Sequence, residues 1–208
     1  MYNYKKMFVM LFLGFGSGLP YILLISTSTA WLRDVNVDLS YIGFFTWITF
    51  TYTFKFAWAP LVDRFSIPFL AQYGHRKSWI AFMQILIFIS LLFISNIDPI
   101  ENFILFCIVG ATIAFAGSIQ DIAIDAFRIE YAHISDQGNL AASYQLGYRL
   151  AIIAATSIAL IFADINGWSM TFKLMAGLMC LGLLGVIFSK EEKNKELGKL
   201  NFINSIVE

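Results

Sequence analysis

The sequence predicts an all-α membrane protein whose six transmembrane helices are arranged as two triplets. Of the 208 residues, 59% are hydrophobic and only 13% are charged, whereas about one quarter of the residues in a soluble domain are charged. Apolar runs of membrane-spanning length recur along the chain, and basic residues gather in alternate loops between them. The chain therefore has no room for a sizeable soluble domain. Its formal net charge of zero gives no indication of nucleic-acid binding.

The apolar runs have the length of helices that cross a bilayer. The first follows Lys5 and Lys6 and continues for 25 residues, which exceeds the apolar core of a cleavable signal peptide. Five further runs resemble it in composition. The expected spans are residues 7–31, 41–62, 78–94, 103–127, 140–163 and 168–189, followed by a cytoplasmic linker or tail over 190–208.

Basic residues in the loops and termini predict the orientation of these helices. Ten of them fall on one side of the expected spans, and only Arg33 falls in a loop on the other side. The ten are Lys5, Lys6, Arg64, Arg76, Lys77, Arg128, Lys190, Lys193, Lys195 and Lys199. Because cytoplasmic loops carry an excess of Lys and Arg, this asymmetry predicts that both termini are cytoplasmic.

The stretch from Gly117 to Glu130, GSIQDIAIDAFRIE, places charges inside the fourth expected span. Spacings of four and three residues put Asp121, Asp125 and Arg128 on one face of a helix. Ionisable side chains in an apolar span are costly and usually face a bundle interior or a hydrated cavity. Two interpretations remain open: an ion-coupled path in which a carboxylate binds and releases a proton, and a structural ion network that joins helices at the cytoplasmic edge.

Two cations lie in other expected spans. Lys55 is about six residues inside the end of the second span, where it can either extend to the interface or form a buried ion pair. Arg149 is near the middle of the fifth span, and we expect it to pair with a carboxylate or to line a hydrated cavity. Asp121 lies at comparable depth and is a candidate partner for either cation. Both cations occupy the second helix of a triplet, which fits an inverted three-helix repeat.

The first span contains a glycine-rich segment, GFGSGLP, at residues 14–20. Such a segment permits close approach of two helix backbones or a break in the helix. A phosphate-binding loop is not supported, because no Gly-Lys-Ser/Thr follows. A nucleophile elbow is not supported either, because Phe15 and Leu19 flank Ser17 at the positions that need glycine.

Eight segments, in consistent order from about residue 12 to residue 188, resemble the AmpG-type muropeptide permeases of the major facilitator superfamily. They are GFGSGLP (14–20), AWL (30–32), DLSYIGFF (38–45), YTFKFAWAPLVDR (52–64), HRKSW (75–79), QDIAIDAFR (120–128), GYRLA (147–151) and LIFADINGW (160–168). The motifs are specific as a set, although each is short. The loop with Asp63, Arg64, Arg76 and Lys77 looks like the signature gating loop between helices two and three of that superfamily.

The resemblance implies a proton-driven importer that carries anhydromuropeptides, cell-wall fragments of a disaccharide and a short peptide, across the bacterial inner membrane for recycling. The implied partners are the muropeptide, protons and membrane lipid, with no cofactor, no metal and no enzymatic activity. In that fold the first and fourth helices line the central cavity. The implied cavity residues are Gly14, Gly16, Ser17, Gly18 and Gln120, and the candidates for proton coupling or ion pairing are Asp121, Asp125, Lys55, Arg149 and Arg128.

Members of this family have about twelve helices in two six-helix halves, whereas this chain carries six expected spans. We therefore expect the N-terminal half of such a transporter, which would need a second six-helix half for alternating access. The alternative is a truncated membrane fragment that does not transport. An intramembrane aspartyl protease is not supported, because its carboxylates lie on different helices, whereas Asp121 and Asp125 share one.

Overall fold

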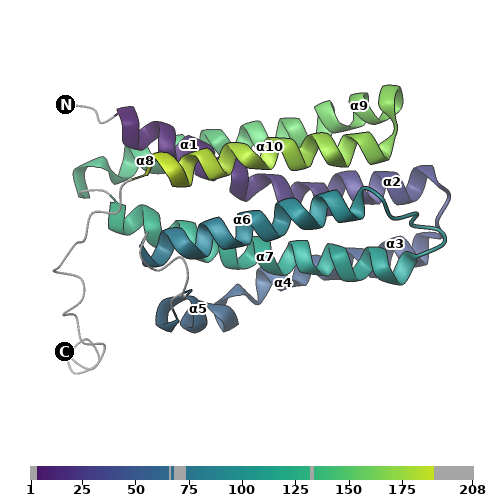
Figure 1. The fold of residues 1–208 in the computed structure, drawn as a ribbon, viewed down its shortest axis with the longest axis horizontal. Coiled ribbons are helices and arrows are strands. Elements are labelled where there is room, and N and C mark those ends of the chain that lie inside the picture. The colour runs from purple at the N-terminus through teal and green to yellow at the C-terminus, as the bar shows by residue number, and fades with distance from the viewer. Residues whose placement is uncertain (1–3, 66, 68–73, 132–133, 190–208) are drawn as a thin grey trace.

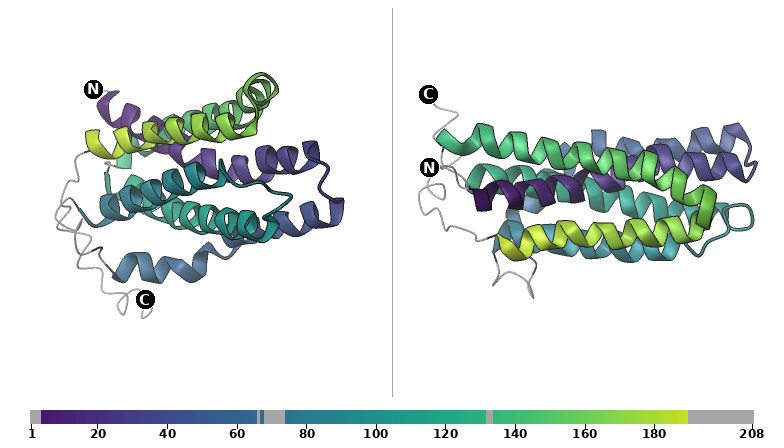
Figure 2. Two further views of the ribbon diagram at one scale, coloured as in Figure 1. Left: turned by 45° about the vertical axis from the view of Figure 1, so that its right-hand side comes forward. Right: turned by 90° about the horizontal axis from the view of Figure 1, so that it is seen from above.

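The computed structural model of the protein describes residues 4–65, 67, 74–131 and 134–189. Over these residues every regular element is helical, which confirms the predicted all-α fold. Five helices in this part of the chain are long and apolar enough to cross a membrane, and they pack lengthwise into one bundle (Figures 1 and 2). They are Tyr4–Asp34, His75–Ile94, Phe103–Tyr131, Gln137–Asn166 and Trp168–Phe188.

Two of these long helices contain a π-helical turn. The first consists of α1 (Tyr4–Ile22), a π-helical turn (Leu23–Ser28) and α2 (Thr29–Asp34), and the other of α8 (Gln137–Ile153), a π-helical turn (Ala154–Ile158) and α9 (Ala159–Asn166). Pro20 lies inside α1 without ending it, so the glycine-rich segment does not break the helix. The two π-helical turns are in contact, and the hydroxyl of Thr27 donates a hydrogen bond to the carbonyl oxygen of Ala155.

The second expected span, residues 41–62, is not one long helix. It is divided into α3 (Leu39–Thr46), a 3-10 turn (Trp47–Thr49), α4 (Phe50–Thr53) and α5 (Lys55–Arg64), with a break at Phe54. The hydroxyls of Thr46, Thr49 and Thr51 each donate to the carbonyl oxygen three residues earlier. Such local bonds can compete with the regular helical pattern, and three of them fall within this interrupted segment, which apolar composition alone did not predict.

This interrupted segment lies alongside α7 (Phe103–Tyr131). The ring of Tyr41 packs against that of Phe103 with centroids 5.2 Å apart, and Trp58 packs against Phe115 at the same separation. Much of its other side is exposed: Phe44, Trp47, Phe50, Phe54 and Phe56. In a bilayer these aromatic rings meet lipid or another protein segment.

Glycines allow α1 and α8 to approach each other closely. Gly14 and Gly18 lie one turn apart on α1 and face Tyr144 and Tyr148 of α8, while Gly147 of α8 faces the backbone of α1. A β-carbon at Gly14 or Gly147 would collide with a main-chain carbonyl of the opposite helix. The glycine-rich segment is therefore a helix-packing surface, the first of the two roles expected for it.

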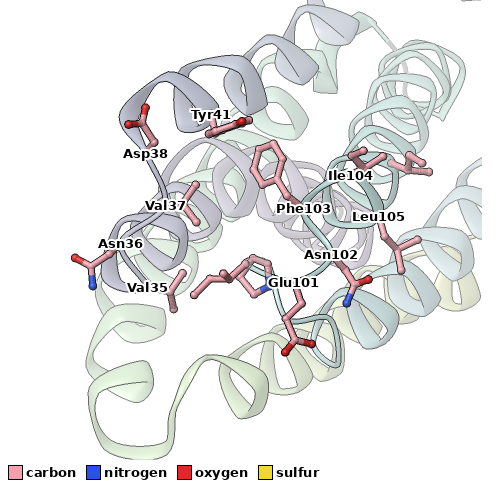
Figure 3. Close-up of a pocket in the computed structure, with 13 residues that line it drawn as sticks. Val35, Asn36, Val37, Asp38, Tyr41, Glu101, Asn102, Phe103, Ile104 and Leu105 are labelled. Carbon is pink, nitrogen blue, oxygen red and sulfur yellow. The ribbon is translucent and has the colours of Figure 1, made fainter.

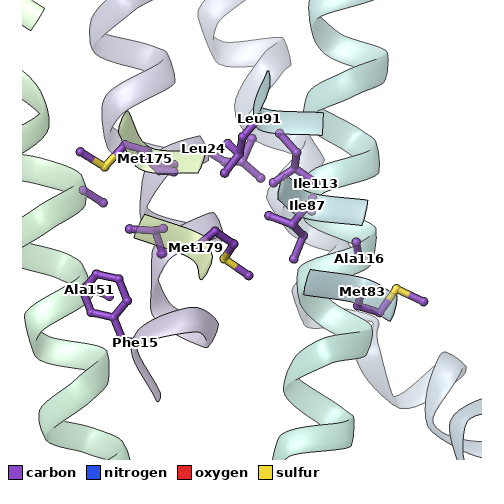
Figure 4. Close-up of a cluster of buried hydrophobic side chains, with 14 of the residues drawn as sticks. Phe15, Leu24, Met83, Ile87, Leu91, Ile113, Ala116, Ala151, Met175 and Met179 are labelled. Carbon is purple, nitrogen blue, oxygen red and sulfur yellow. The ribbon is translucent and has the colours of Figure 1, made fainter. Parts of the chain in front are cut away.

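Apolar side chains fill the interior between α1, α6 (His75–Ile94), α7 and α10 (Trp168–Phe188). Ile87, Ile113 and Met179 reach this core from α6, α7 and α10 and are fully buried (Figure 4). Near one end of the bundle the indole of Trp31 packs against aromatic rings from α7 and α10, namely Phe106, Trp168 and Phe172. The core thus fastens α1 to the pair formed by α6 and α7.

The described basic residues expected on the inner side lie at one end of the bundle, whereas Lys190, Lys193, Lys195 and Lys199 of the expected tail fall outside the described residues. Lys6, near the start of α1, donates a hydrogen bond to the carbonyl oxygen of Tyr131 at the end of α7, at 2.8 Å. Lys77, near the start of α6, donates to the carbonyl oxygen of Ser189 just beyond α10, at 2.9 Å. Arg33 lies in the last turn of α2, at the opposite end (Figure 1).

We predict that Gly147→Ala lowers the free energy of unfolding by about 1–3 kcal/mol, because the added methyl group forces α1 and α8 apart. Thermal unfolding of the purified protein in detergent measures this change. Gly177→Ala in α10 is the control, because no atom lies within 4 Å of the position a β-carbon would take there. An unchanged melting temperature for Gly147→Ala would contradict the close contact between the two helices.

Candidate functional site

A polar pocket of about 350 Å³ opens where α1, α4, α5, α7 and α8 meet. Its lining combines tyrosine and threonine hydroxyls with one cation and one carboxylate. The lining residues are Tyr21, Thr49, Phe50, Tyr52, Thr53, Lys55, Asp121 and Tyr148. The pocket therefore contains two of the charged residues that the sequence singled out, Lys55 and Asp121.

Asp121 is bound by a serine hydroxyl of α1, which in turn contacts a tyrosine hydroxyl of α8. Ser17 of α1 donates a hydrogen bond to Asp121 Oδ1 at 2.5 Å, and the oxygen of Tyr144 in α8 lies 2.7 Å from Ser17 Oγ. Ser17 is 1% exposed, so its hydroxyl is shielded from solvent. Asp121 thus joins α7 to α1 and α8 through neutral donors, in a span where a charged partner was expected.

Asp125, one turn further along α7, takes the charged partners instead. Lys55 Nζ lies 3.9 Å from one of its oxygens, and Arg128 lies 3.7 Å from the other. The side chains of Lys55 and Asp125 are 45% and 44% exposed, so this pair is open to solvent or to another chain. The Arg128 guanidinium also lies over the ring of Tyr144, 5.6 Å from its centroid.

The structure corrects the expected pairing of Asp121 with Arg149 or Lys55. Among the ion pairs formed by the described residues, Lys55 binds Asp125 and none includes Arg149, whose side chain is exposed on α8. The sequence argument compared depth along each helix but could not give rotation about the helix axis. Tyr144 and Tyr148, which the sequence analysis did not select, occupy the side of α8 that faces Asp121 and its pocket. Their spacing of four residues in an apolar span was the available signal.

Tyr52 is a third tyrosine that the sequence analysis missed. Its ring meets that of Tyr21 edge to face with centroids 4.8 Å apart, and its buried hydroxyl has no hydrogen-bond partner among the described residues. A β-carbon at Gly117 would overlap the Tyr52 oxygen. Gly117, the residue that opens the charged stretch of α7, therefore makes room for this hydroxyl beside the pocket.

The predicted cavity residues divide into three groups. Ser17 contacts Asp121, whereas Gly14 and Gly18 pack against α8. Gly16 and Gln120 lie inside the bundle: Gln120 is fully buried, and a β-carbon on Gly16 would meet the side-chain amide of Gln84. The glycines and Gln120 do not line the pocket in this structure, because helical rotation turns them towards neighbouring helices.

The gating-loop residues are partly assembled by one arginine. Arg76 Nη1 lies 2.6 Å from Asp63 Oδ1, and Arg76 Nε lies 3.1 Å from Glu130 Oε1. The arginine thereby connects the end of α5 to the end of α7. Glu130 takes part in this ion-pair group, although the sequence analysis did not select it. Lys77 caps the end of α10 as described above, and Arg64 is exposed at the end of α5.

The pocket with the larger volume, about 810 Å³, lies at the opposite end of the bundle (Figure 3). Apolar side chains such as Val37 and Ile104 line it, with carboxylates at Asp38 and Glu101. Asp38 caps α3: hydrogen bonds with Ser40, whose backbone N–H donates at 2.7 Å, lower the pKa of its carboxyl group. Asp38 is therefore engaged in helix capping. Within the described residues, no three His, Cys, Asp or Glu side chains converge as metal ligands would.

We predict that the ion pair of Arg76 with Glu130 has a larger coupling energy than the ion pair of Lys55 with Asp125. A double-mutant cycle on Arg76→Gln with Glu130→Gln should give a coupling energy of about 1 kcal/mol or more, because the Arg76 side chain is only 14% exposed and binds two carboxylates. The matched cycle on Lys55→Gln with Asp125→Asn should stay below about 1 kcal/mol, as exposed pairs do. Melting of the solubilised protein measures both. Equal coupling energies would contradict the assignment.

Comparison with known proteins identifies the family of this chain. The sequence profile of the Major Facilitator Superfamily matches residues 5–202. The chain is 32% identical to "Putative transporter AmpG 4" of Rickettsia conorii over 201 residues, which cover 96% of this chain and 48% of that protein. It is 35% identical to "Anhydromuropeptide permease" of Escherichia coli over 184 residues, covering 88% and 37% respectively.

A further relative, "Putative transporter AmpG 4" of Rickettsia felis, is 32% identical over 204 residues, which cover 97% of this chain and 49% of that protein. The chain thus spans about half the length of these relatives, or less. Its helices, its membrane-spanning composition and the profile match agree: the chain belongs to the Major Facilitator Superfamily of multi-pass membrane transporters, and AmpG-type proteins are among its relatives.

Proposed function

We propose that this chain forms the N-terminal half of a proton-coupled transporter that imports anhydromuropeptides across the bacterial inner membrane. The family supplies the transport class, and the relatives with AmpG and anhydromuropeptide permease in their names support the substrate class. The observation that carries the proposal is Asp121, a carboxylate in an apolar span that lines a polar pocket and is bound by Ser17.

Asp121 has the surroundings that reversible protonation requires. The ion pairs among the described residues leave it without a cation within 4 Å, since Lys55 and Arg128 both bind Asp125. A proton neutralises such a charge, and its release restores the charge, which is the elementary step of proton coupling. Access is available because Asp121 lines an open pocket.

The pocket offers groups that match a sugar–peptide substrate. Hydroxyls of Tyr21, Tyr52 and Tyr148 can donate to or accept from sugar hydroxyls and amides, and the ammonium group of Lys55 can bind a carboxylate. A volume of about 350 Å³ lies at the low end of ligand pockets, so it would hold only part of a disaccharide with a short peptide. The remaining contacts would come from the other half of a complete transporter.

A second six-helix half is therefore part of the proposal. Alternating access works by movement of one bundle against another around a shared site, and the relatives are about twice as long as this chain. The competing function is a membrane fragment that does not transport. Uptake measurements with and without a matching second half separate the two.

We also propose that the end of the bundle with Lys6, Arg76 and Lys77 faces the cytoplasm. The basic residues meet there, and the start of α1 and the end of α10 lie at that end (Figure 1). Helices 75–94 and 103–131 would then be joined on the periplasmic side.

We predict that a reporter fused after Ser189 is active in the cytoplasm and that one inserted in residues 95–101 is active in the periplasm. The reason is the bias of basic residues towards one end of the bundle. Paired alkaline phosphatase and fluorescent-protein fusions measure both positions. The opposite outcome at either position would reject the proposed orientation.

We predict that the chain restores muropeptide uptake to a permease-deficient bacterium only when it is co-expressed with a matching second half. In that complete transporter, Asp121→Asn should abolish accumulation driven by acidic external pH, because the amide cannot carry the proton. Asp164→Asn, at an exposed carboxylate in α9, is the control and should retain uptake. Accumulation by Asp121→Asn with unchanged pH dependence would exclude Asp121 as the proton carrier, and robust uptake by the chain alone would overturn the requirement for a second half.

A further inference from the structure

Three oxygen atoms from three helices form a continuous chain of hydrogen bonds. Tyr144 of α8 contacts Ser17 of α1 at 2.7 Å, and Ser17 contacts Asp121 of α7 at 2.5 Å. Ser17 has one hydroxyl hydrogen, which it donates to the charged carboxylate. The hydrogen between Tyr144 and Ser17 must then come from Tyr144. The direction of both bonds is therefore fixed while Asp121 is charged.

Protonation of Asp121 changes what this chain can do. A proton on Oδ1 faces Ser17 Oγ, the partner that this carboxyl oxygen has among the described residues. Ser17 then accepts from Asp121 and turns its own hydrogen to Tyr144. Tyr144 becomes the acceptor in that bond, and its hydroxyl hydrogen is left free. The three oxygens now carry three hydrogens instead of two, and the hydrogen that no longer takes part in the chain is that of the Tyr144 hydroxyl.

We propose that Ser17 and Tyr144 form a relay that transmits the protonation state of Asp121 in α7 to the hydroxyl group of Tyr144 in α8. In the charged state the Tyr144 hydrogen is bound to Ser17; in the protonated state it is available to an oxygen of the substrate or to water. This inference rests on the proposed function, in which Asp121 carries the proton. It assigns to Ser17 a positioning role and to Tyr144 a role in coupling.

The packing of the helices keeps the relay in register. Ser17 is 1% exposed, so water does not compete for its single hydrogen. Gly14 lies against the backbone of Tyr144, and Gly147 lies against the backbone of α1. This contact holds α8 close enough to α1 for the tyrosine oxygen to reach Ser17. A wider separation would admit water and remove the fixed direction of the bonds.

Other titratable groups surround the relay and must be separated from Asp121 in any measurement. They are Asp125, Lys55, Arg128, Tyr21, Tyr52 and Tyr148. Within the described residues none of them is hydrogen-bonded to Ser17, Tyr144 or Asp121. The carboxyl signal of Asp125 is the one most easily mistaken for that of Asp121, because Asp125 is a second carboxylate on the same helix face.

Infrared difference spectroscopy between acidic and alkaline pH tests the relay on the full chain reconstituted in lipid, with tyrosine carrying a ring isotope label. We expect a protonated-carboxyl band and a shift of a tyrosine C–O band with the same pH midpoint. Both signals should disappear in Asp121→Asn and remain in Asp125→Asn. Circular dichroism and melting of each variant confirm that it is folded.

Two variants separate the relay from a direct effect of charge on the tyrosine. Ser17→Ala should keep the carboxyl band and lose the tyrosine shift, and Tyr144→Phe should do the same. Tyr148→Phe and Ser118→Ala are the matched controls and should keep both signals, because Tyr148 lines the pocket outside the relay and the Ser118 hydroxyl bonds within α7 to Phe115. A tyrosine shift that persists in Ser17→Ala overturns the relay.

The outcomes distinguish the relay from the transport proposal. A carboxyl band without a tyrosine shift in the unmodified chain overturns the relay and leaves Asp121 as a proton carrier. Absence of any Asp121 carboxyl band over the pH range overturns both assignments for Asp121. If the carboxyl and tyrosine signals are coupled but the chain fails the uptake experiment, both with and without a second half, the relay is supported and only the proposed transport function is rejected.

Discussion

The close contact between α1 and α8 is the constraint on which the rest of the structure depends. In a bilayer, lipid tails are as apolar as leucine, so helices associate through tight packing and hydrogen bonds. Gly14, Gly18 and Gly147 remove the side chains that would otherwise keep these two helices apart. The same contact positions Tyr144 against Ser17, and Ser17 in turn reaches Asp121 on α7. A packing motif and a polar site are thus products of one segment, GFGSGLP.

The cost of burying charge explains how the ionisable residues are distributed. Near the basic end of the bundle, Arg76 binds Asp63 and Glu130 at 2.6 and 3.1 Å, and its own side chain is only 14% exposed, as expected of a structural contact. Asp125 sits in a looser and more exposed group with Lys55 and Arg128. Asp121 has the Ser17 hydroxyl as its partner instead of a cation. On the α7 face that the sequence singled out, Asp125 forms ion pairs with Lys55 and Arg128, as a structural network would, whereas a proton path through Asp121 stays a proposal.

Hydrophobic length and charge bias were sufficient to predict the all-α fold, the approximate ends of the long helices and the gathering of basic residues at one end. They could not predict the interruptions of residues 39–64, because this stretch has the apolar composition of a continuous span. They also could not predict the partners of Asp121. Depth along a helix follows from residue number, but the direction of a side chain depends on how helices are rotated against each other. Tyr144 and Tyr52 were missed because a phenol in an apolar span leaves no charge signal.

The position of Arg149 indicates that its side of α8 faces water or another protein segment and not lipid. It lies near the middle of a 30-residue apolar helix, its side chain is exposed, and no ion pair among the described residues includes it. An arginine at that depth is costly against lipid. Lys55 and Asp125, also about half exposed, lie beside the same pocket. A surface that carries these charges is stable when it faces a hydrated cavity or another polar helix. The arrangement of two bundles around a central aqueous site provides both.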